Sequence, residues 1–156
     1  MSATLIRLSA SALVYRDADQ RFLIIEEVVN DRVVLDVPGG TWETGETLLD
    51  TSIREAAEEA SIQFVPQHYL GCFVTEYTSA RGQRVCSVRN TFAGVLGNQT
   101  PDIPRDSSTQ AIYWMNLVEL LYSHQRLRSS APLTCIQAYL KGRLLPLDFC
   151  DQTIDF

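Results

Sequence analysis

Apolar and polar positions follow strand spacing in the first part of the chain and helical spacing in the middle. Residues 8–15, 21–27 and 33–37 are rich in strand-favouring residues and are separated by polar turns, so we expect three extended segments. The apolar residues that follow recur at i, i+4, i+7, i+8 and i+11 and share one helical stripe: Leu49, Ile53, Ala56, Ala57 and Ala60. The pattern therefore predicts an amphipathic helix after three strands.

The second half of the chain predicts further strands and then short helices. Residues 63–67 contain Pro66 and are expected to be a connector, whereas residues 69–77 and 83–96 predict a hairpin around the polar loop 78–82. Residues 97–108 form the longest loop, and residues 111–115 predict a last short strand. Asn116 and Glu119 have the spacing of a capping box that opens a short helix, and another helix is expected over residues 130–141. These elements indicate an α+β or α/β sandwich.

The central helix carries acidic residues opposite its apolar stripe. Glu55, Glu58 and Glu59 stand at i, i+3 and i+4, so they are neighbours on the helix surface and repel one another. A divalent cation such as Mg²⁺ would offset this repulsion, although acidic runs on helices are more often solvated faces. A ligand site is favoured by the turn predicted at residues 38–40, whose glycines allow close approach, and by Arg54, four residues before Glu58.

The charged positions of this stretch resemble the Nudix box, G-x5-E-x7-R-E-U-x-E-E-x-G-U, in which U is a bulky apolar residue. Gly40, Glu46 and the run at residues 54–62 stand at the spacings of that motif. Two positions depart from it: Ser61 stands where the family has Gly, and Ala56 is small for its position. The Ser61 departure concerns the end of the helix, where Gly commonly adopts a left-handed conformation.

The resemblance implies a Nudix fold, an α+β fold built as an α/β/α sandwich, in which a mixed sheet lies between helices and the box forms a loop, a helix and a loop. Stretches at residues 26–30, 66–69, 127–129 and 139–147 also resemble one bacterial phosphatase branch of the family. That branch acts on nucleoside di- and triphosphates and on a thiamine-precursor pyrophosphate. The expected activity is therefore cleavage of a phosphoanhydride bond with Mg²⁺, or with Mn²⁺ in its place.

Two other functions remain open. One is a catalytically silent, nucleotide-binding Nudix module that acts as a sensor or regulator. Such modules typically lose box glutamates, whereas every charged box position is present here. The other is a Nudix-fold isomerase, which would need further catalytic residues that the sequence does not reveal. Phosphate release from nucleotides with and without Mg²⁺ separates these functions from hydrolysis.

The resemblance also implies a ligand set for the metal. Glu58 and Glu59 are expected to be the main ligands, and Glu55 either completes the set or acts as the base. The carbonyl of Gly39 or Gly40 is the expected backbone ligand.

Other residues have supporting roles in this interpretation. Arg54 is expected to orient Glu58, and Glu46 to link the loop to the helix. A further acidic residue from a later loop often completes Nudix sites. Asp106 is the first candidate for it and Glu76 the second.

Substrate contacts are expected from arginines and aromatic residues. Arg89 lies on a strand expected to cross the site, with Arg84 and Arg81 nearby, and guanidinium groups suit bidentate phosphate contacts. Trp42 and Tyr77 are candidates for stacking on a base. The alternatives are solvated strand arginines and aromatics that only pack.

Length and composition limit the other possibilities. A chain of 156 residues with 46% apolar residues predicts one domain over residues 1–156. Its formal charge of −6 argues against nucleic-acid or anionic-membrane binding, but a metal can still attract a small phosphorylated substrate. Four dispersed cysteines predict reduced thiols and a cytoplasmic location, and residues 1–15 read as a strand rather than a signal peptide. No protein partner is indicated.

Overall fold

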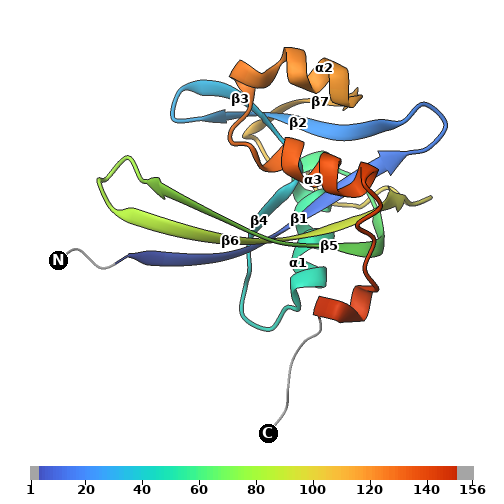
Figure 1. Ribbon diagram of the computed structural model, residues 1–156, viewed down its shortest axis with the longest axis horizontal. Helices are drawn as coiled ribbons and strands as arrows, with labels where there is room; N and C mark the ends of the chain where they lie inside the picture. The colour runs from blue at the N-terminus through green and yellow to red at the C-terminus, as the bar shows by residue number, and fades with distance from the viewer. Residues whose placement is uncertain (1–3, 151–156) are drawn as a thin grey trace, which may run out of the picture.

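The computed structural model describes residues 4–150. Strands dominate the first two thirds of the chain, and most helices follow the last strand (Figure 1). The elements are β1 (Leu5–Arg16), β2 (Arg21–Val29), β3 (Arg32–Asp36), β4 (Gly39–Thr41), α1 (Leu48–Ala60), β5 (Phe64–Thr78), β6 (Arg84–Leu96), β7 (Thr109–Met115), α2 (Leu117–Tyr122), η1 (His124–Arg126), α3 (Ala131–Leu140) and η2 (Leu147–Cys150).

Strand β1 lies at the centre of a mixed sheet with the order β3-β2-β1-β6-β5. It runs parallel to β6 and antiparallel to β4, and its last residues pair with β2. Strand β7 pairs with β2, and β5 and β6 form the expected antiparallel hairpin. Because β1, β5 and β6 are long, they extend together beyond the helices as a three-stranded arm (Figure 1).

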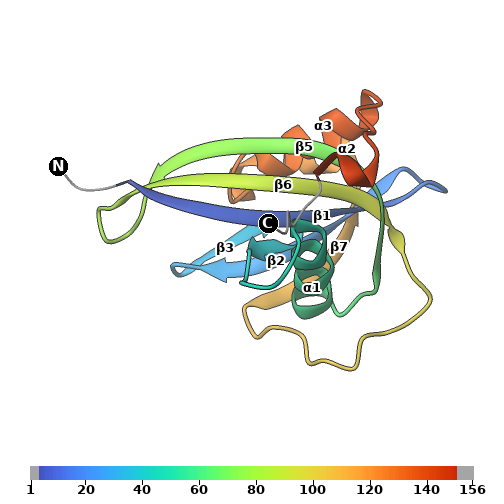
Figure 2. The ribbon, with the colours of Figure 1, turned by 90° about the horizontal axis from the view of Figure 1, so that it is seen from below.

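Two hydrophobic clusters lie on opposite faces of the sheet. Figure 2 shows α1 on one side of β1, and α2 and α3 on the other. Neighbouring residues of β1 point to opposite faces, so Leu13 packs with Leu120 and Ile136 of the later helices. Ala12 instead packs with Ala56 of α1. Helices therefore lie on both faces, which confirms the α/β/α sandwich, with α1 on one side of the central strand and α2 and α3 on the other.

Two segments differ from the predicted pattern. The expected connector at residues 63–67 belongs mostly to β5, which tolerates Pro66 because it is an edge strand with a register shift between Pro66 and His68. The glycines of the expected turn at residues 38–40 instead open β4, where Gly39 pairs with Ser11 and Gly40 with Ala10.

Helix α2 has the expected cap, and α3 has the expected proline in its first turn. The side chain of Asn116 accepts a hydrogen bond from the backbone N–H of Glu119, whose carboxylate accepts one in return, so the predicted capping box of α2 is present. Helix α3 has Pro132 in its first turn. Across residues 4–150, no helix is long and apolar enough to span a membrane.

Helix α1 ends at a strained residue. Ser61 adopts the left-handed conformation, with φ 53° and ψ 41°, and its backbone N–H donates to the carbonyl of Ala57. Only Gly adopts this conformation without a steric penalty, which explains the Gly that the box has at this position.

Replacing Ser61 by Gly is expected to raise the free energy of unfolding by about 1 kcal/mol, because the penalty for a left-handed side-chain residue is removed. Urea denaturation of the two proteins measures the change. Gly142 also has a positive φ, of 75°, so Gly142→Ser serves as the reverse control and should destabilise the protein. An unchanged or lower midpoint for Ser61→Gly would show that the conformation carries no penalty here.

Candidate active site

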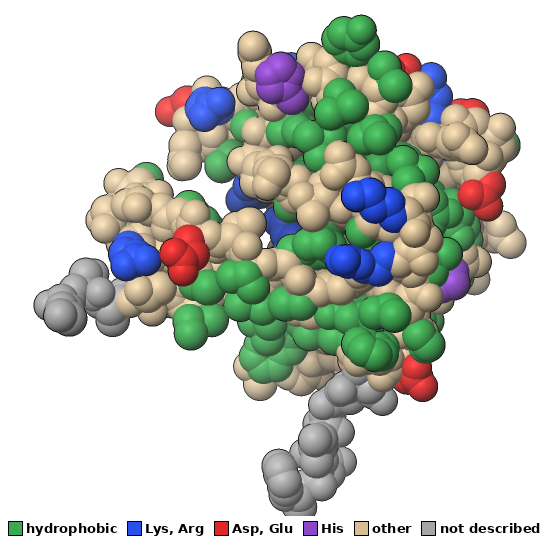
Figure 3. All heavy atoms as spheres, in the orientation of Figure 1, with side chains coloured by type: hydrophobic (Ala, Val, Ile, Leu, Met, Phe, Trp, Pro, Cys, Tyr) green, Lys and Arg blue, Asp and Glu red, His purple; other side chains and the backbone are tan. Residues whose placement is uncertain are grey.

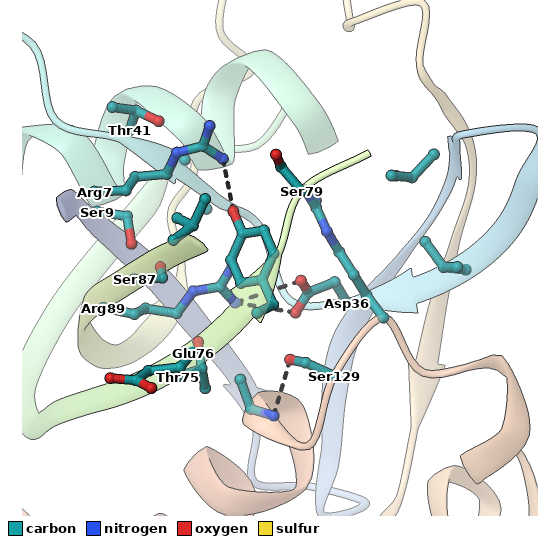
Figure 4. Close-up of a pocket in the computed structure, with 18 of the residues that line it drawn as sticks. Arg7, Ser9, Asp36, Thr41, Thr75, Glu76, Ser79, Ser87, Arg89 and Ser129 are labelled. Atoms are coloured by element: carbon teal, nitrogen blue, oxygen red, sulfur yellow. Dashed lines mark hydrogen bonds and ion pairs between the residues drawn. The ribbon is translucent and has the colours of Figure 1, made fainter. Parts of the chain in front are cut away.

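A cleft of ≈ 1030 Å³ lies between the β1–β6–β5 arm and the β2–β3 hairpin. Alternate residues of β1, β5 and β6 form its floor, and β4 and the start of α3 close its inner end. Figure 3 shows a hollow with lysine or arginine atoms at its bottom, and Figure 4 shows labelled polar side chains from several strands converging on it. The cleft is thus lined by strands that are far apart in the sequence.

The glutamates of α1 lie at the inner end of this cleft. Glu59 lines it directly. Glu55 and Glu59 are 9% and 8% exposed, so the prediction that all three glutamates lie on the face opposite the core is wrong for these two. Only the side chain of Glu58 is substantially open, at 45% exposure.

Two glycines of β4 make room for the buried carboxylates. A Cβ atom on Gly40 would overlap the carboxylate of Glu55, and one on Gly39 would overlap Ser11 of β1. The backbone N–H of Gly39 donates to Glu59 Oε2 at 2.8 Å. The pair of glycines therefore lets α1 press its acidic side chains against the strand backbone.

Arg54 connects the loop before α1 to the glutamates of the helix. Its Nε donates to Glu46 Oε1 at 2.6 Å, and its Nη1 donates to Glu55 Oε1 at 2.7 Å and to Glu58 Oε2 at 3.1 Å. Thr51 Oγ1 donates to Glu46 Oε2 at 2.8 Å. The expected contact of Arg54 with Glu58 is present, as is the expected link of Glu46 between the loop and the helix.

Burial changes the protonation of these groups. Desolvation raises the pKa of Glu59 to about 8, against the opposing effect of the Gly39 hydrogen bond. Desolvation also raises the pKa of Glu55, which Arg54 partly counteracts. Hydrogen bonding to Glu46 raises the pKa of Arg54. Burial therefore disfavours the charged forms of Glu55 and Glu59.

Two ion pairs, each with a buried carboxylate, lie beside the glutamates. Arg89 Nη1 donates to Asp36 Oδ1 at 3.2 Å, and Arg128 Nη1 donates to Glu27 Oε2 at 3.2 Å. Asp36 raises the pKa of Arg89, so this guanidinium is charged. Arg89 points into the cleft, as the strand pattern predicts, but it already has an acidic partner (Figure 4). Its contact with substrate phosphates remains a prediction.

The other predicted substrate residues divide between the cleft and its surroundings. Tyr77 and Arg81 line the cleft. Trp42 and Arg84 are not among the residues that line it. Trp42 Nε1 donates to the carbonyl of Glu46 at 2.7 Å, and Arg84 Nη2 pairs with Glu76 at 3.3 Å.

The two candidates for a further acidic ligand also differ in position. Glu76 lines the cleft, whereas Asp106 does not. Asp106 Oδ1 accepts a hydrogen bond from the backbone N–H of Ser108, and the Asp106 N–H donates to the carbonyl of Glu58 at 2.7 Å. The loop of Asp106 therefore lies against the end of α1 while its side chain closes a turn.

Sequence reasoning missed three arginines that line the cleft, Arg7, Arg32 and Arg128. The alternation of β1 offered a clue for one of them, because Arg7, Ser9 and Ser11 occupy one face while apolar residues occupy the other. Nothing local identifies the other two, which reach the cleft only through the packing of distant segments.

The oxygen atoms available at the inner end of the cleft are of the chemical type that binds a hard divalent cation. Carboxylate oxygens and backbone carbonyls are the ligands that Mg²⁺ takes, and Glu55, Glu59 and the Gly39–Gly40 backbone meet at one end of the cleft. Within residues 4–150, no three acidic, His or Cys side chains converge on one point. Arg54 holds Glu55 and Glu58, and Glu59 turns to Gly39, so these carboxylates are occupied by protein donors.

Comparisons with known proteins agree with this architecture. The family model described as NUDIX domain matches residues 5–134. Phosphatase NudJ of Escherichia coli (strain K12) is 30% identical over 131 residues, which cover 84% of this chain and 82% of that protein.

Solved structures show the same fold. A NUDIX hydrolase from Nitrosomonas europaea superposes with a TM-score of 0.81 and 26% identity, covering 94% of this chain and 97% of that one. A bifunctional NMN adenylyltransferase/ADP ribose pyrophosphatase from Francisella tularensis, complexed with AMP and a Mn ion, gives 0.60 and 19%, covering 92% of this chain and 43% of that one. The matching family model, the related phosphatase and the shared fold show that the chain belongs to the Nudix family and is a Nudix pyrophosphohydrolase.

Proposed function

We propose that the protein hydrolyses a phosphoanhydride bond in nucleoside di- or triphosphates or related small pyrophosphates, with Mg²⁺ or Mn²⁺ as the cofactor. One observation carries the proposal: hydrogen bonds link Arg54 to the glutamates of the box beside the inner end of a cleft that Glu59 and several arginines line. The likeness to NudJ supports a phosphatase activity. The AMP and Mn ion of the Francisella protein support a nucleotide substrate and a divalent metal.

The metal would be held by Glu58 and Glu59, by Glu55 and by the carbonyl of Gly39 or Gly40. Asp106 or Glu76 would complete the set. When bound, the metal supplies charge neutralisation for the phosphates and lowers the pKa of a coordinated water.

The chain's own residues bind and orient the reactants. Arg54 fixes Glu58 and Glu55 by hydrogen bonds to both, so their carboxylates are preorganised. A water oxygen bonds to phosphorus while the bond from phosphorus to the bridging oxygen breaks, and the leaving phosphate keeps that electron pair. Glu55, where it is not a metal ligand, accepts the proton of the water. Arg89 and Arg128 at the inner end present positive charge to the phosphate oxygens.

The proposal is tested by measuring phosphate and nucleotide release from a panel of nucleoside diphosphates, nucleoside triphosphates, ADP-ribose and a thiamine-precursor pyrophosphate. Each substrate is assayed with Mg²⁺, with Mn²⁺ and with EDTA. Metal-dependent turnover of at least one substrate is expected. If all compounds bind but none turns over, the silent nucleotide-binding module becomes the better description.

Metal binding is expected to raise the melting temperature of the wild-type protein. A ligand that binds only the folded state stabilises it by about 2.7 kcal/mol at a hundredfold excess over its Kd. Changing Glu55, Glu58 and Glu59 together to Gln should abolish this response, because the negative charges that attract the cation are gone. The variant should melt no lower than the metal-free wild type. Thermal melts with and without Mg²⁺ measure both effects, and a full response of the triple variant would place the metal elsewhere.

A further inference from the structure

The floor of the cleft consists of rows of side chains set by strand register. Arg89 of β6 pairs with Ser9 of β1, and the next row outward on the same face is formed by Arg7, Ser87 and Thr75 (Figure 4). Since an antiparallel or parallel strand rises about 3.3 Å per residue, this second row lies about 7 Å from the first along the strands. The cleft therefore continues well beyond the part that a diphosphate needs.

The outer half of the cleft carries its own arginines. Arg7 comes from β1, Arg32 from the beginning of β3, and Arg81 from the loop between β5 and β6, and all three line the cleft. Together with Arg89 and Arg128, they make five of the chain's 13 basic residues, in a protein of net charge −6. Positive charge is thus concentrated in this cleft.

These outer arginines differ from the inner ones in their partners. Arg89 and Arg128 each pair with an acidic side chain. Within residues 4–150, Arg7 donates only to Tyr77 Oη, at 3.3 Å, and neither Arg32 nor Arg81 has an acidic partner. Glu76, the acidic residue at this end of the cleft, is paired with Arg84, which lies outside the cleft lining. The outer half therefore presents uncompensated positive charge.

We propose that Arg7, Arg32 and Arg81 form a second anion subsite, which binds a further phosphate monoester on the sugar of the substrate. Guanidinium groups from separate elements surround a phosphate well, because each offers planar, paired N–H donors. The spacing of one strand row from Arg89 suits a phosphate on the same ribose as the 5′-diphosphate. This inference rests on the proposed function and names its preferred substrate class: nucleoside 5′-diphosphates that carry an additional ribose phosphate.

The reaction on such a substrate leaves the sugar phosphate unchanged. Water attacks the α-phosphorus of the 5′-diphosphate, the bond from that phosphorus to the bridging oxygen breaks, and the β-phosphate leaves as inorganic phosphate with the electron pair. The ribose phosphate contributes only to binding, through its contacts with Arg7, Arg32 and Arg81.

The test compares adenosine 5′-diphosphate with the same compound carrying a 3′-phosphate. The wild-type protein should favour the 3′-phosphorylated probe by about tenfold or more in kcat/KM. In the triple variant Arg7→Gln/Arg32→Gln/Arg81→Gln, this preference should fall to about twofold or less. The three side chains are exposed, and the melting temperature verifies that the variant folds.

A matched control removes three exposed basic residues outside the cleft, Arg16→Gln/Lys141→Gln/Arg143→Gln, so the net charge changes equally. It should keep the wild-type preference; if it loses the preference as the cleft variant does, the effect is general electrostatics. Equal kcat/KM for both probes in the wild type, or a preference that survives in the cleft variant, overturns the proposal.

Calorimetry measures the binding of both probes in metal-free buffer. It separates the anion-subsite proposal from the hydrolase proposal, because binding is measured without turnover. The Kd for the 3′-phosphorylated probe should be about tenfold lower in the wild type and equal to that of adenosine 5′-diphosphate in the cleft variant. Tight, arginine-dependent binding without turnover of any nucleotide would count against the hydrolase proposal while supporting the subsite. Turnover without the preference would do the reverse.

Discussion

Replacing Glu58 by Gln is expected to lower kcat/KM for nucleotide substrates by about 10²–10³-fold while the melting temperature stays near that of the wild type. Its side chain is 45% exposed and accepts one hydrogen bond, from Arg54. Gln still accepts that bond but lacks the negative charge that a divalent cation requires. Steady-state kinetics at saturating Mg²⁺ and a thermal melt measure the two effects.

Two other glutamates serve as controls for this change. Glu43 is 69% exposed and lies 3.9 Å from Arg54, so Glu43→Gln removes a nearby charge without touching the helix and should leave kcat/KM within about twofold. Glu46→Gln should reduce activity less than Glu58→Gln but lower the melting temperature, because Glu46 is bound by Arg54 and Thr51. A drop of only fewfold for Glu58→Gln would remove this residue from the metal ligands.

The sequence predicts α1 well but not the burial of its charges. Helical periodicity locates Ala56 and Ala60 on the core face, and both are buried. The same periodicity puts Glu55 and Glu59 in solvent, because a pattern of residue types treats every carboxylate as exposed. Their burial depends on Gly39 and Gly40, which lie on a strand that the helix contacts only in the folded chain.

The length of the cleft likewise depends on strands that are far apart in the sequence but pair in the fold. The local sequence pattern predicts the strand that contains Arg89 and the face on which its side chain lies, since alternation alone decides which residues share a face. It does not show that Arg7 lies beside Ser87, because that neighbourhood depends on the parallel register of β1 and β6. Nor does it bring Arg32 to the cleft, which follows from the packing of the β2–β3 hairpin.

Replacing Arg89 by Ala is expected to destabilise the protein by about 3–5 kcal/mol, because it leaves a buried carboxylate without its partner. Asp36 is 2% exposed and the side chain of Arg89 is 17% exposed, so water reaches neither group well. Sequence reasoning expected the main effect of this change to be on phosphate binding. The ion pair with Asp36 indicates that Arg89 also contributes to the stability of the fold.

A double-mutant cycle with Asp36→Asn separates these roles. Asp36 Oδ1 also accepts a hydrogen bond from the backbone N–H of Val37 at 2.8 Å, and Asn keeps that acceptor. The Asp36→Asn/Arg89→Ala protein should therefore be more stable than Arg89→Ala alone, by at least about 1 kcal/mol. Urea denaturation of the four proteins gives the coupling energy, and a value near zero would show that the pair contributes nothing.

Arg89→Lys then isolates the contact with substrate. Lysine keeps the positive charge beside Asp36, so most of the stability should remain, but it lacks the planar pair of donors that a phosphate accepts. If Arg89 binds substrate phosphates, kcat/KM should fall about tenfold while the Mg²⁺-induced rise in melting temperature is preserved, because the main proposed metal ligands belong to α1. Wild-type kcat/KM in Arg89→Lys would leave Arg89 only its structural pairing with Asp36, and substrate binding at the inner end would then depend on Arg128.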